Sequence, residues 1–171
     1  ESLQEIMSAA VIEAQKVIQR EAPGSGTTLT AALVLGQQMT IAHVGDSRAY
    51  VVYNDGRIET VTRDHSLVKR LEELGHITPE EAVNYPHRNV LYRALGQGEV
   101  LEPDIFTIPF PSTGTMMMCS DGLWGVLSEQ ELIRAVREST NLQRACQSLV
   151  SSANAAGGPD NISVILVQMT N

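Results

Sequence analysis

An apolar run that stops at an acidic residue is the feature that most constrains the fold of this chain. Residues 116–119, three Met and one Cys, show no helical period and have turn residues on both sides, which favours a strand covered on both faces. Asp121 follows where this strand ends, and Gly122 permits another part of the backbone to approach closely. A carboxylate at the mouth of a buried strand is costly unless it is paired. Asp121 is therefore either a cation ligand or a turn-forming residue that caps its own backbone.

Composition restricts the partners and the compartment. With 171 residues the chain has the length of one domain, and its net charge of −8 and pI near 4.9 argue against nucleic-acid or membrane-surface partners. No apolar run reaches the roughly 18 residues that a membrane span needs. Cys119 and Cys146 lie in apolar patterns, so we expect two buried free thiols and a reducing, cytoplasmic location.

Hydrophobic periodicity predicts strands and helices that cluster separately along the chain. An amphipathic helix over residues 2–20 comes first, and short turns then join strands at 27–35, 39–44, 49–53 and 58–62 into an antiparallel meander. A strand at 104–110 precedes the apolar run. Helices at 128–140 and 142–155 follow it, and a buried strand at 162–169 ends the pattern. This order predicts an α+β fold.

A segment between two of the strands offers little to a core. Residues 66–89 contain two short, charged helical patterns, the second of which begins with Thr78, Pro79 and a Glu at its third position. We expect this segment to form a surface flap within the domain of residues 1–171.

Four acids recur where strands end: Asp46, Asp64, Asp121 and Asp160. Carboxylates without Cys or His ligand motifs form oxygen-only sites, which Mg²⁺ or Mn²⁺ prefers, whereas the absence of HExxH and CxxC spacing argues against zinc. The structural alternative is that all four acids cap turns.

Six short motifs in order across the chain resemble the metal-dependent protein phosphatases, the type 2C or PPM serine/threonine phosphatases, in their bacterial form. They are Gly26-Thr27-Thr28, Val44-Gly45-Asp46-Ser47-Arg48, Asp64-His65-Ser66, Arg93-Ala94-Leu95-Gly96, Ser120-Asp121-Gly122-Leu123-Trp124 and Gly158-Pro159-Asp160-Asn161-Ile162-Ser163. The resemblance implies a sandwich of two antiparallel β-sheets flanked by helices.

The same resemblance implies metal-dependent hydrolysis of phosphoserine and phosphothreonine in phosphorylated proteins or peptides, by a hydroxide that bridges two ions. It makes Asp121 and Asp160 ligands of a dinuclear Mg²⁺ or Mn²⁺ centre. It makes Asp46 or Asp64 candidates for a third, weaker ion. No further catalytic residue is expected in this chain, because the ions carry the chemistry.

One departure from the family pattern leaves alternatives open. The family's early acidic pair and its Asp-Gly-x-Gly-Gly turn are not in this sequence, which begins at the helix that would follow them. We therefore expect an N-terminally truncated, partial domain that is inactive or weakly active alone. The alternatives are a non-catalytic, phosphatase-like binding or regulatory domain, and a phosphatase of an anti-sigma antagonist. The flap argues mildly against the second alternative.

Overall fold

The computed structural model describes residues 2–169, which divide into two compact units. The first unit takes in the residues up to Leu33, then Met39–Asp46 and Asp64–Ile108. The second takes in Val34–Gln38, Ser47–Arg63 and the residues from Pro109 on. The first unit holds most of the three-stranded sheet described below, and the second holds the four-stranded sheet.

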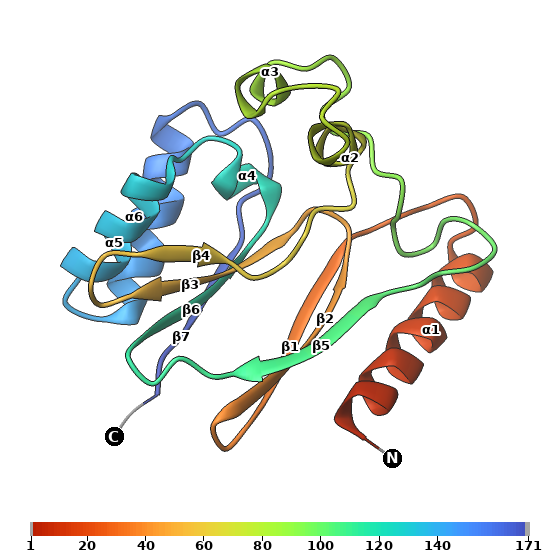
Figure 1. Ribbon diagram of the computed structural model, residues 1–171, viewed down its shortest axis with the longest axis horizontal. Helices are drawn as coiled ribbons and strands as arrows, with labels where there is room; N and C mark the ends of the chain where they lie inside the picture. Colours follow the sequence, from red (N-terminus) through yellow and green to blue (C-terminus); the bar gives the residue numbers. More distant parts are fainter. Residues whose placement is uncertain (1, 170–171) are drawn as a thin grey trace. The chain divides into compact units, whose positions relative to one another are not determined.

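The first unit is built on a three-stranded sheet and one long helix. The sheet has the order β1-β2-β5, and its members are β1 (Leu29–Leu35), β2 (Gln38–Val44) and β5 (Asp104–Pro109). Helix α1 (Leu3–Glu21) begins at a capping box in which Ser2 and Glu5 satisfy each other's backbone amides. Helix α1 lies beside this sheet (Figure 1), and the core that they share contains Val11, Ala42, Val44, Leu95 and Leu101.

Two short helices lie in the segment that we expect to form a flap. They are α2 (Leu67–Glu73) and α3 (Pro79–Val83), and neither contributes a buried residue. Helix α3 begins at the predicted Thr78, whose side chain accepts a hydrogen bond from the amide of Glu81. The boundary of the flap at residues 66–89 stays a prediction.

The second unit contains an antiparallel four-stranded sheet in the order β4-β3-β6-β7. Its members are β3 (Arg48–Tyr53), β4 (Ile58–Thr60), β6 (Gly114–Cys119) and β7 (Val164–Val167). The apolar run of the sequence is β6, which pairs with β3 on one side and with β7 on the other. Met116 and Met117 are accordingly buried, as the sequence predicts for a strand covered on both faces.

Helices cover this second sheet. They are the short α4 (Asp121–Trp124), α5 (Glu129–Glu138) and α6 (Leu142–Ala155), and α5 and α6 lie side by side in Figure 1. Leu123, Leu132 and Leu149 pack against Tyr50 and Met117 in one buried cluster. Helix α5 starts at a capping box of Ser128 and Glu131, close to the start of the predicted helix at 128–140. The short helix α4 was not predicted from the sequence.

The α+β class with two antiparallel sheets and helices is confirmed, with three corrections. The strands at 29–60 form two separate hairpins in different sheets, not one meander. The final strand is an edge strand, so it is only half-buried, and Ile165 is 56% exposed. Cys119 is buried as expected, but Cys146 is only partly buried.

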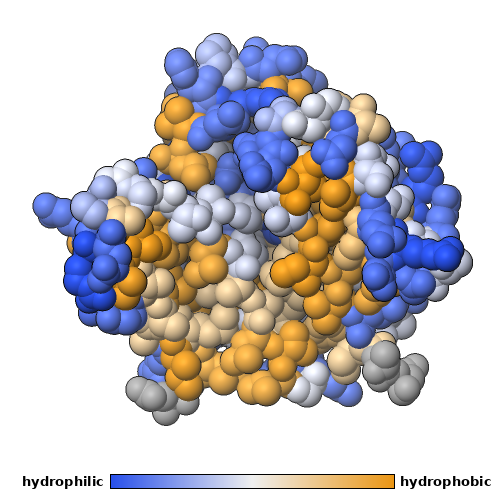
Figure 2. Space-filling model, turned by 180° about the vertical axis from the view of Figure 1, so that it is seen from behind, coloured by the Kyte–Doolittle hydropathy of each residue, from blue (hydrophilic) through white to orange (hydrophobic). Residues whose placement is uncertain are grey.

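Some large apolar side chains reach the surface. Hydrophobic residues gather on the face shown in Figure 2, and the exposed ones of the chain include Leu33, Leu35 and Val100. No helix within residues 2–169 is long and apolar enough to cross a membrane.

Candidate functional site

The end of β6 positions Asp121, the residue that the sequence singles out. Strand β6 is an inner strand, and its last residues Met118 and Cys119 pair with Ala49 and Arg48 of β3 and with Ile165 and Val164 of β7. The chain leaves the sheet at Ser120, and Asp121 then starts the short helix α4. Asp121 is partly exposed, at the mouth of a strand whose interior residues are buried.

Ser120 joins this strand end to the loop that precedes β7. The Ser120 amide donates to the Ser163 carbonyl at 3.1 Å, and the Ser163 amide donates back to Ser120 Oγ at 3.0 Å. The same hydroxyl donates to the Asn161 carbonyl at 3.1 Å. Three hydrogen bonds therefore hold the segment of Asp160 against the segment of Asp121.

Gly122 brings the two segments into direct contact. A Cβ atom at this position would meet the carbonyl oxygen of Asn161 and would lie 3.3 Å from the carbonyl carbon of Asp160. The sequence-based expectation of a close backbone approach at Gly122 is confirmed, and the group that approaches is the Asp160-Asn161 backbone.

The two carboxylates differ in their surroundings. Asp160 is exposed, and its Oδ1 accepts a hydrogen bond from the Asn161 amide at 2.7 Å, as a turn-capping Asp does. Within residues 2–169, no side chain or amide donates to the Asp121 carboxylate. The turn-capping alternative thus describes Asp160 in part and does not describe the side chain of Asp121.

The donor set at this place suits a hard cation. An ionised carboxylate at the end of a buried strand needs compensation, and two carboxylates attract a small divalent ion, which takes water at its remaining positions. Among the described residues, no cluster of three or more His, Cys, Asp or Glu side chains is close enough to hold a metal ion. Asp121 and Asp160 can therefore supply part of a coordination shell.

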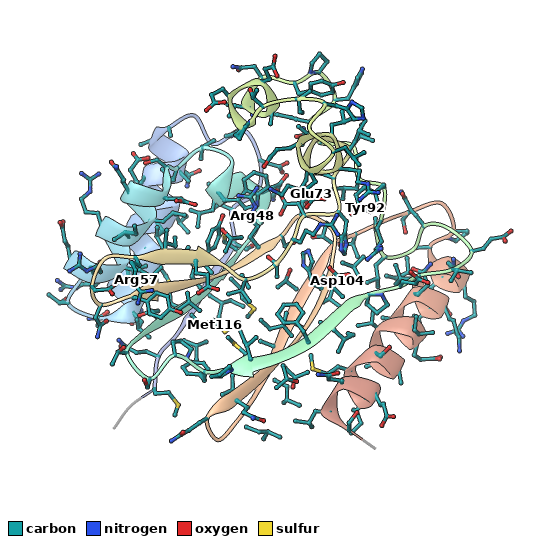
Figure 3. The ribbon with its side chains drawn as sticks, in the orientation of Figure 1. Arg48, Arg57, Glu73, Tyr92, Asp104 and Met116 are labelled. Carbon is teal, nitrogen blue, oxygen red and sulfur yellow. The ribbon has the colours of Figure 1, made fainter. Side chains whose placement is uncertain are left out.

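An arginine lies over the aromatic ring next to this site. The guanidinium carbon of Arg48 is 3.5 Å from the centre of the Trp124 ring, and Arg48 Nη1 donates to the Tyr50 hydroxyl at 3.1 Å. Figure 3 shows Arg48 among the side chains around α4. Such stacking orients a guanidinium and covers one face of the ring, so Trp124 acts as a packing partner of Arg48.

The other two acids, Asp46 and Asp64, belong to the first unit. Both are buried, with exposed fractions of 9% and 5%. The residue before Asp46 and the residue after Asp64 are bonded twice, because the His65 amide donates to the Gly45 carbonyl at 2.8 Å and the Gly45 amide donates to His65 Nδ1 at 3.0 Å. The four predicted acids therefore fall into two pairs, one pair in each unit.

A partly buried polar network surrounds the buried His65 ring. Its Nε2 lies 3.0 Å from Oδ2 of Asp104, and Arg93 Nη1 donates to Oδ1 of the same carboxylate at 2.9 Å. The rings of His43 and Tyr92 lie 4.9 and 5.8 Å from the His65 ring, centre to centre. Tyr92 and Asp104 are labelled in Figure 3.

Sequence reasoning identified only part of this network. It included His65 in the motif Asp64-His65-Ser66 but assigned no partner to that side chain, and the side chains of His43 and His65 are both fully buried. It missed Asp104, which it read only as the start of a strand. The partners His65 and Asp104 are 39 positions apart, and no local pattern connects them.

Comparison with known proteins places the chain among bacterial phosphatases. The model of the family described as protein phosphatase 2C matches residues 1–162. The chain is 39% identical over 166 residues to the serine/threonine phosphatase Stp of Listeria welshimeri, and this match covers 97% of the chain and 65% of that relative. The chain thus spans about two thirds of the length of such relatives.

Solved structures agree with these relatives. The Streptococcus agalactiae serine/threonine phosphatase superposes with a TM-score of 0.90 at 33% identity, over 96% of this chain and 71% of that one. The catalytic domain of the serine/threonine protein phosphatase PstP, solved in complex with two manganese ions, superposes with a TM-score of 0.83 at 31% identity, over 96% and 70% of the two chains.

Proposed function

Because the chain belongs to the protein phosphatase 2C family, we propose that it supplies metal-binding carboxylates to an enzyme that hydrolyses phosphoserine and phosphothreonine in proteins. One observation carries the proposal. The Asp121 carboxylate stands at the end of a buried inner strand without a partner among the described residues, and hydrogen bonds of Ser120 hold the Asp160 loop against it.

In this proposal Asp121 and Asp160 are the metal ligands of the chain. Divalent cations bound there would supply the positive charge that activates water and stabilises a transferring phosphoryl group. The residues of the chain hold the carboxylates: Ser120 fixes the loop, Gly122 allows the close approach, and Leu123 anchors α4 in the core. We assign no nucleophilic role to Ser47, Ser120 or Cys119.

The cation is proposed to be Mn²⁺ or Mg²⁺. Carboxylate and water oxygens suit both ions, and the manganese complex of the PstP catalytic domain supports a divalent metal of this class. Asp46 and Asp64 stay candidates for binding a further, weaker ion. Phosphorylated proteins in the cytoplasm are the proposed substrates, by analogy with the serine/threonine phosphatases among the relatives.

A phosphatase assay tests the proposal. The natural protein that contains this chain should release phosphate from a phosphoserine peptide in the presence of Mn²⁺, and a chelator should abolish this release. Asp121→Asn should lower the rate by more than about a hundredfold, which is the upper end of the loss expected for a mere outer-shell partner of a metal ligand. The assay should be repeated with Mg²⁺ to rank the two ions.

A matched control separates ligand loss from a general change in charge. Asp55→Asn removes an exposed acid of the same unit that pairs with Arg57, so this variant should keep wild-type activity. Chelator-resistant hydrolysis, or equal activity of the Asp121→Asn and Asp55→Asn variants, would contradict the proposal.

A further inference from the structure

The side chain of His65 fastens the turn that carries Asp46 to the segment that carries Asp64. The Gly45 amide donates to His65 Nδ1 at 3.0 Å, and the His65 amide donates to the Gly45 carbonyl at 2.8 Å. Gly45 has a φ of +108°, and a Cβ there would collide with the side chain of Thr28. Glycine adopts this conformation without strain, and the two hydrogen bonds to His65 hold the turn in it.

The other ring nitrogen, Nε2, also has a hydrogen-bond partner. Since Nδ1 accepts the Gly45 N–H, the proton of the neutral ring is on Nε2, and Nε2 donates to Oδ2 of Asp104. Arg93 donates to the other oxygen of that carboxylate, so Asp104 is bound from two sides. The bonds to Gly45 and Asp104 favour one tautomer and one orientation of the ring, and Arg93 Nη1 lies 3.2 Å from the same Nε2.

The main chain of the same residue forms part of the root of the flap, that is, the place where the segments that enter and leave residues 66–89 are hydrogen-bonded to each other. The Tyr92 amide donates to the His65 carbonyl at 3.0 Å, and the Leu67 amide donates to the Val90 carbonyl at 2.8 Å. Ser66, the next residue, forms a bridge with Leu91 and caps helix α2. Both ends of the flap therefore meet at His65.

We infer that His65 is a positioning residue, whose ring holds the Gly45-Asp46 turn beside Asp64 and joins this acid pair to the root of the flap. The inference deepens the proposed function, because it names a residue on which the placement of two candidate metal-binding acids depends. It concerns residues of the first unit only. His65 itself is fully buried and contacts no substrate in this account.

Two substitutions separate the effects of the two ring nitrogens, because each keeps the hydrogen bond of one nitrogen and removes that of the other. Asn at position 65 places an amide oxygen near the Nδ1 position, so it retains an acceptor for the Gly45 amide but loses Asp104. Gln reaches toward Asp104 but leaves the Gly45 amide without its acceptor. If the bond to Gly45 sets the turn, His65→Asn should preserve its geometry and His65→Gln should not.

The hydrogen-exchange rate of the Gly45 amide, measured by NMR on the full chain, reports directly on the turn. In His65→Gln we expect the Gly45 amide to exchange roughly tenfold faster or more, as follows from leaving a buried donor unsatisfied. We expect near wild-type exchange in His65→Asn. In the wild type, the ¹⁵N shifts of the ring should show Nδ1 unprotonated and Nε2 protonated. The opposite tautomer, or equal exchange of Gly45 in both variants, would overturn the inference.

A control of matched burial accounts for general destabilisation. Gln15 is buried in the same unit and bonds to Gly96, Gln97 and Gly98 but not to Gly45. Gln15→Ala should lower stability without changing exchange at Gly45 relative to its neighbours. A selective change at Gly45 in Gln15→Ala would mean that exchange at this turn does not depend specifically on the His65 ring, and would also overturn the inference.

Metal titration then connects the turn to the proposed site. His65→Gln should raise the Mn²⁺ concentration needed for half-maximal phosphate release more than it changes the rate at saturating Mn²⁺. Gln15→Ala should change neither quantity. If the natural protein releases no phosphate at all, the proposed function fails, whereas the exchange and tautomer results still decide the role of His65. If the Mn²⁺ concentration needed for activity is unchanged in His65→Gln although the Gly45 amide exchanges faster, His65 positions the turn without affecting metal binding.

Discussion

Gly122 lies in the candidate site, and its lack of a Cβ determines how closely the segments of Asp121 and Asp160, the two acids proposed to bind metal, approach each other. It lies between the strand end of Asp121 and the backbone of Asp160-Asn161, where a Cβ would meet the Asn161 carbonyl. Ser120 contributes the hydrogen bonds that hold the two segments at this separation. The metal affinity of the site should therefore depend on residues that are not themselves ligands.

Gly122→Ala tests this dependence. The added methyl group forces the 160–161 loop away, so we expect a loss of about 1–3 kcal/mol in the free energy of unfolding and weaker binding of Mn²⁺. Urea denaturation and metal titration measure the two effects. Val126→Ala, which trims a partly buried residue of the same core, is the control. If both variants bind Mn²⁺ equally well, Gly122 has no specific role in the site.

At the residue scale, the sequence predicted acids but not their partners. Asp121 and Gly122 were readable because an apolar run ends at an acid and a glycine, which is a local signal. The pairing of His65 with Asp104 and Arg93 was not readable, since it joins a turn to the start of β5 across the sheet. Hydrogen bonds between distant segments depend on the tertiary fold, which no local pattern encodes.

At the scale of elements, the start of α5 shows how a local signal fixes a boundary. The Ser128 amide and hydroxyl donate to Glu131 Oε2 at 2.7 and 2.8 Å, and Ser128 Oγ accepts from the Glu131 amide. These bonds, the backbone amide first, lower the pKa of Glu131 below its ordinary value of 4.5. Helix α4 had no such signal, because Ser120 forms no side-chain cap there and bonds across to Asn161 instead.

The capping box predicts a pH dependence of stability. A carboxyl whose pKa is lower in the folded state stabilises the fold above its unfolded pKa and ceases to do so as the pH falls through the folded value. Glu131→Gln should therefore have a lower melting temperature than the wild type at pH 7, and this difference should shrink in acid. Thermal melts between pH 7 and pH 3 measure it. A difference that does not change with pH would exclude the ionised cap.

The flap gives a second prediction at this scale. Helices α2 and α3 bury no residues, so local opening should cost little. Amides of residues 67–89 should exchange faster than those of β3 and β6. In the natural protein, Leu71→Ala should alter the selectivity among phosphopeptides more than the turnover of a small aryl phosphate. Equal losses on both substrates would assign Leu71 to the structural core.

At the scale of the whole molecule, exposed apolar edges predict self-association of the 171-residue chain. The edge strands of the described sheets are β1, β5, β4 and β7, and two of them carry a large apolar side chain that is more than half exposed: Leu35 of β1 is 54% exposed and Ile165 of β7 is 56% exposed. Sedimentation velocity should show association that grows with concentration. Ile165→Lys should reduce this association. A chain that stays monomeric throughout would contradict the prediction.

The fold class was predictable at this scale, because strand and helix periods occupy separate stretches of the sequence. The division of the strands between two sheets was not predictable. Turn residues indicate that two strands form a hairpin, but they do not specify to which sheet the hairpin belongs. The half-exposed edge strand β7 was misread for a related reason. Its residues, Val164 to Val167, are uniformly apolar, and composition does not show whether a strand has neighbours on both sides or lies at the edge of a sheet.

Calorimetric titration of the chain with Mn²⁺ tests the central claim most directly, because it measures the ligands without requiring catalysis. We predict weak binding that Asp121→Asn removes and that Asp55→Asn, an exposed acid paired with Arg57, leaves unchanged. Binding that survives both Asp121→Asn and Asp160→Asn would place the cation elsewhere and contradict this account of the site.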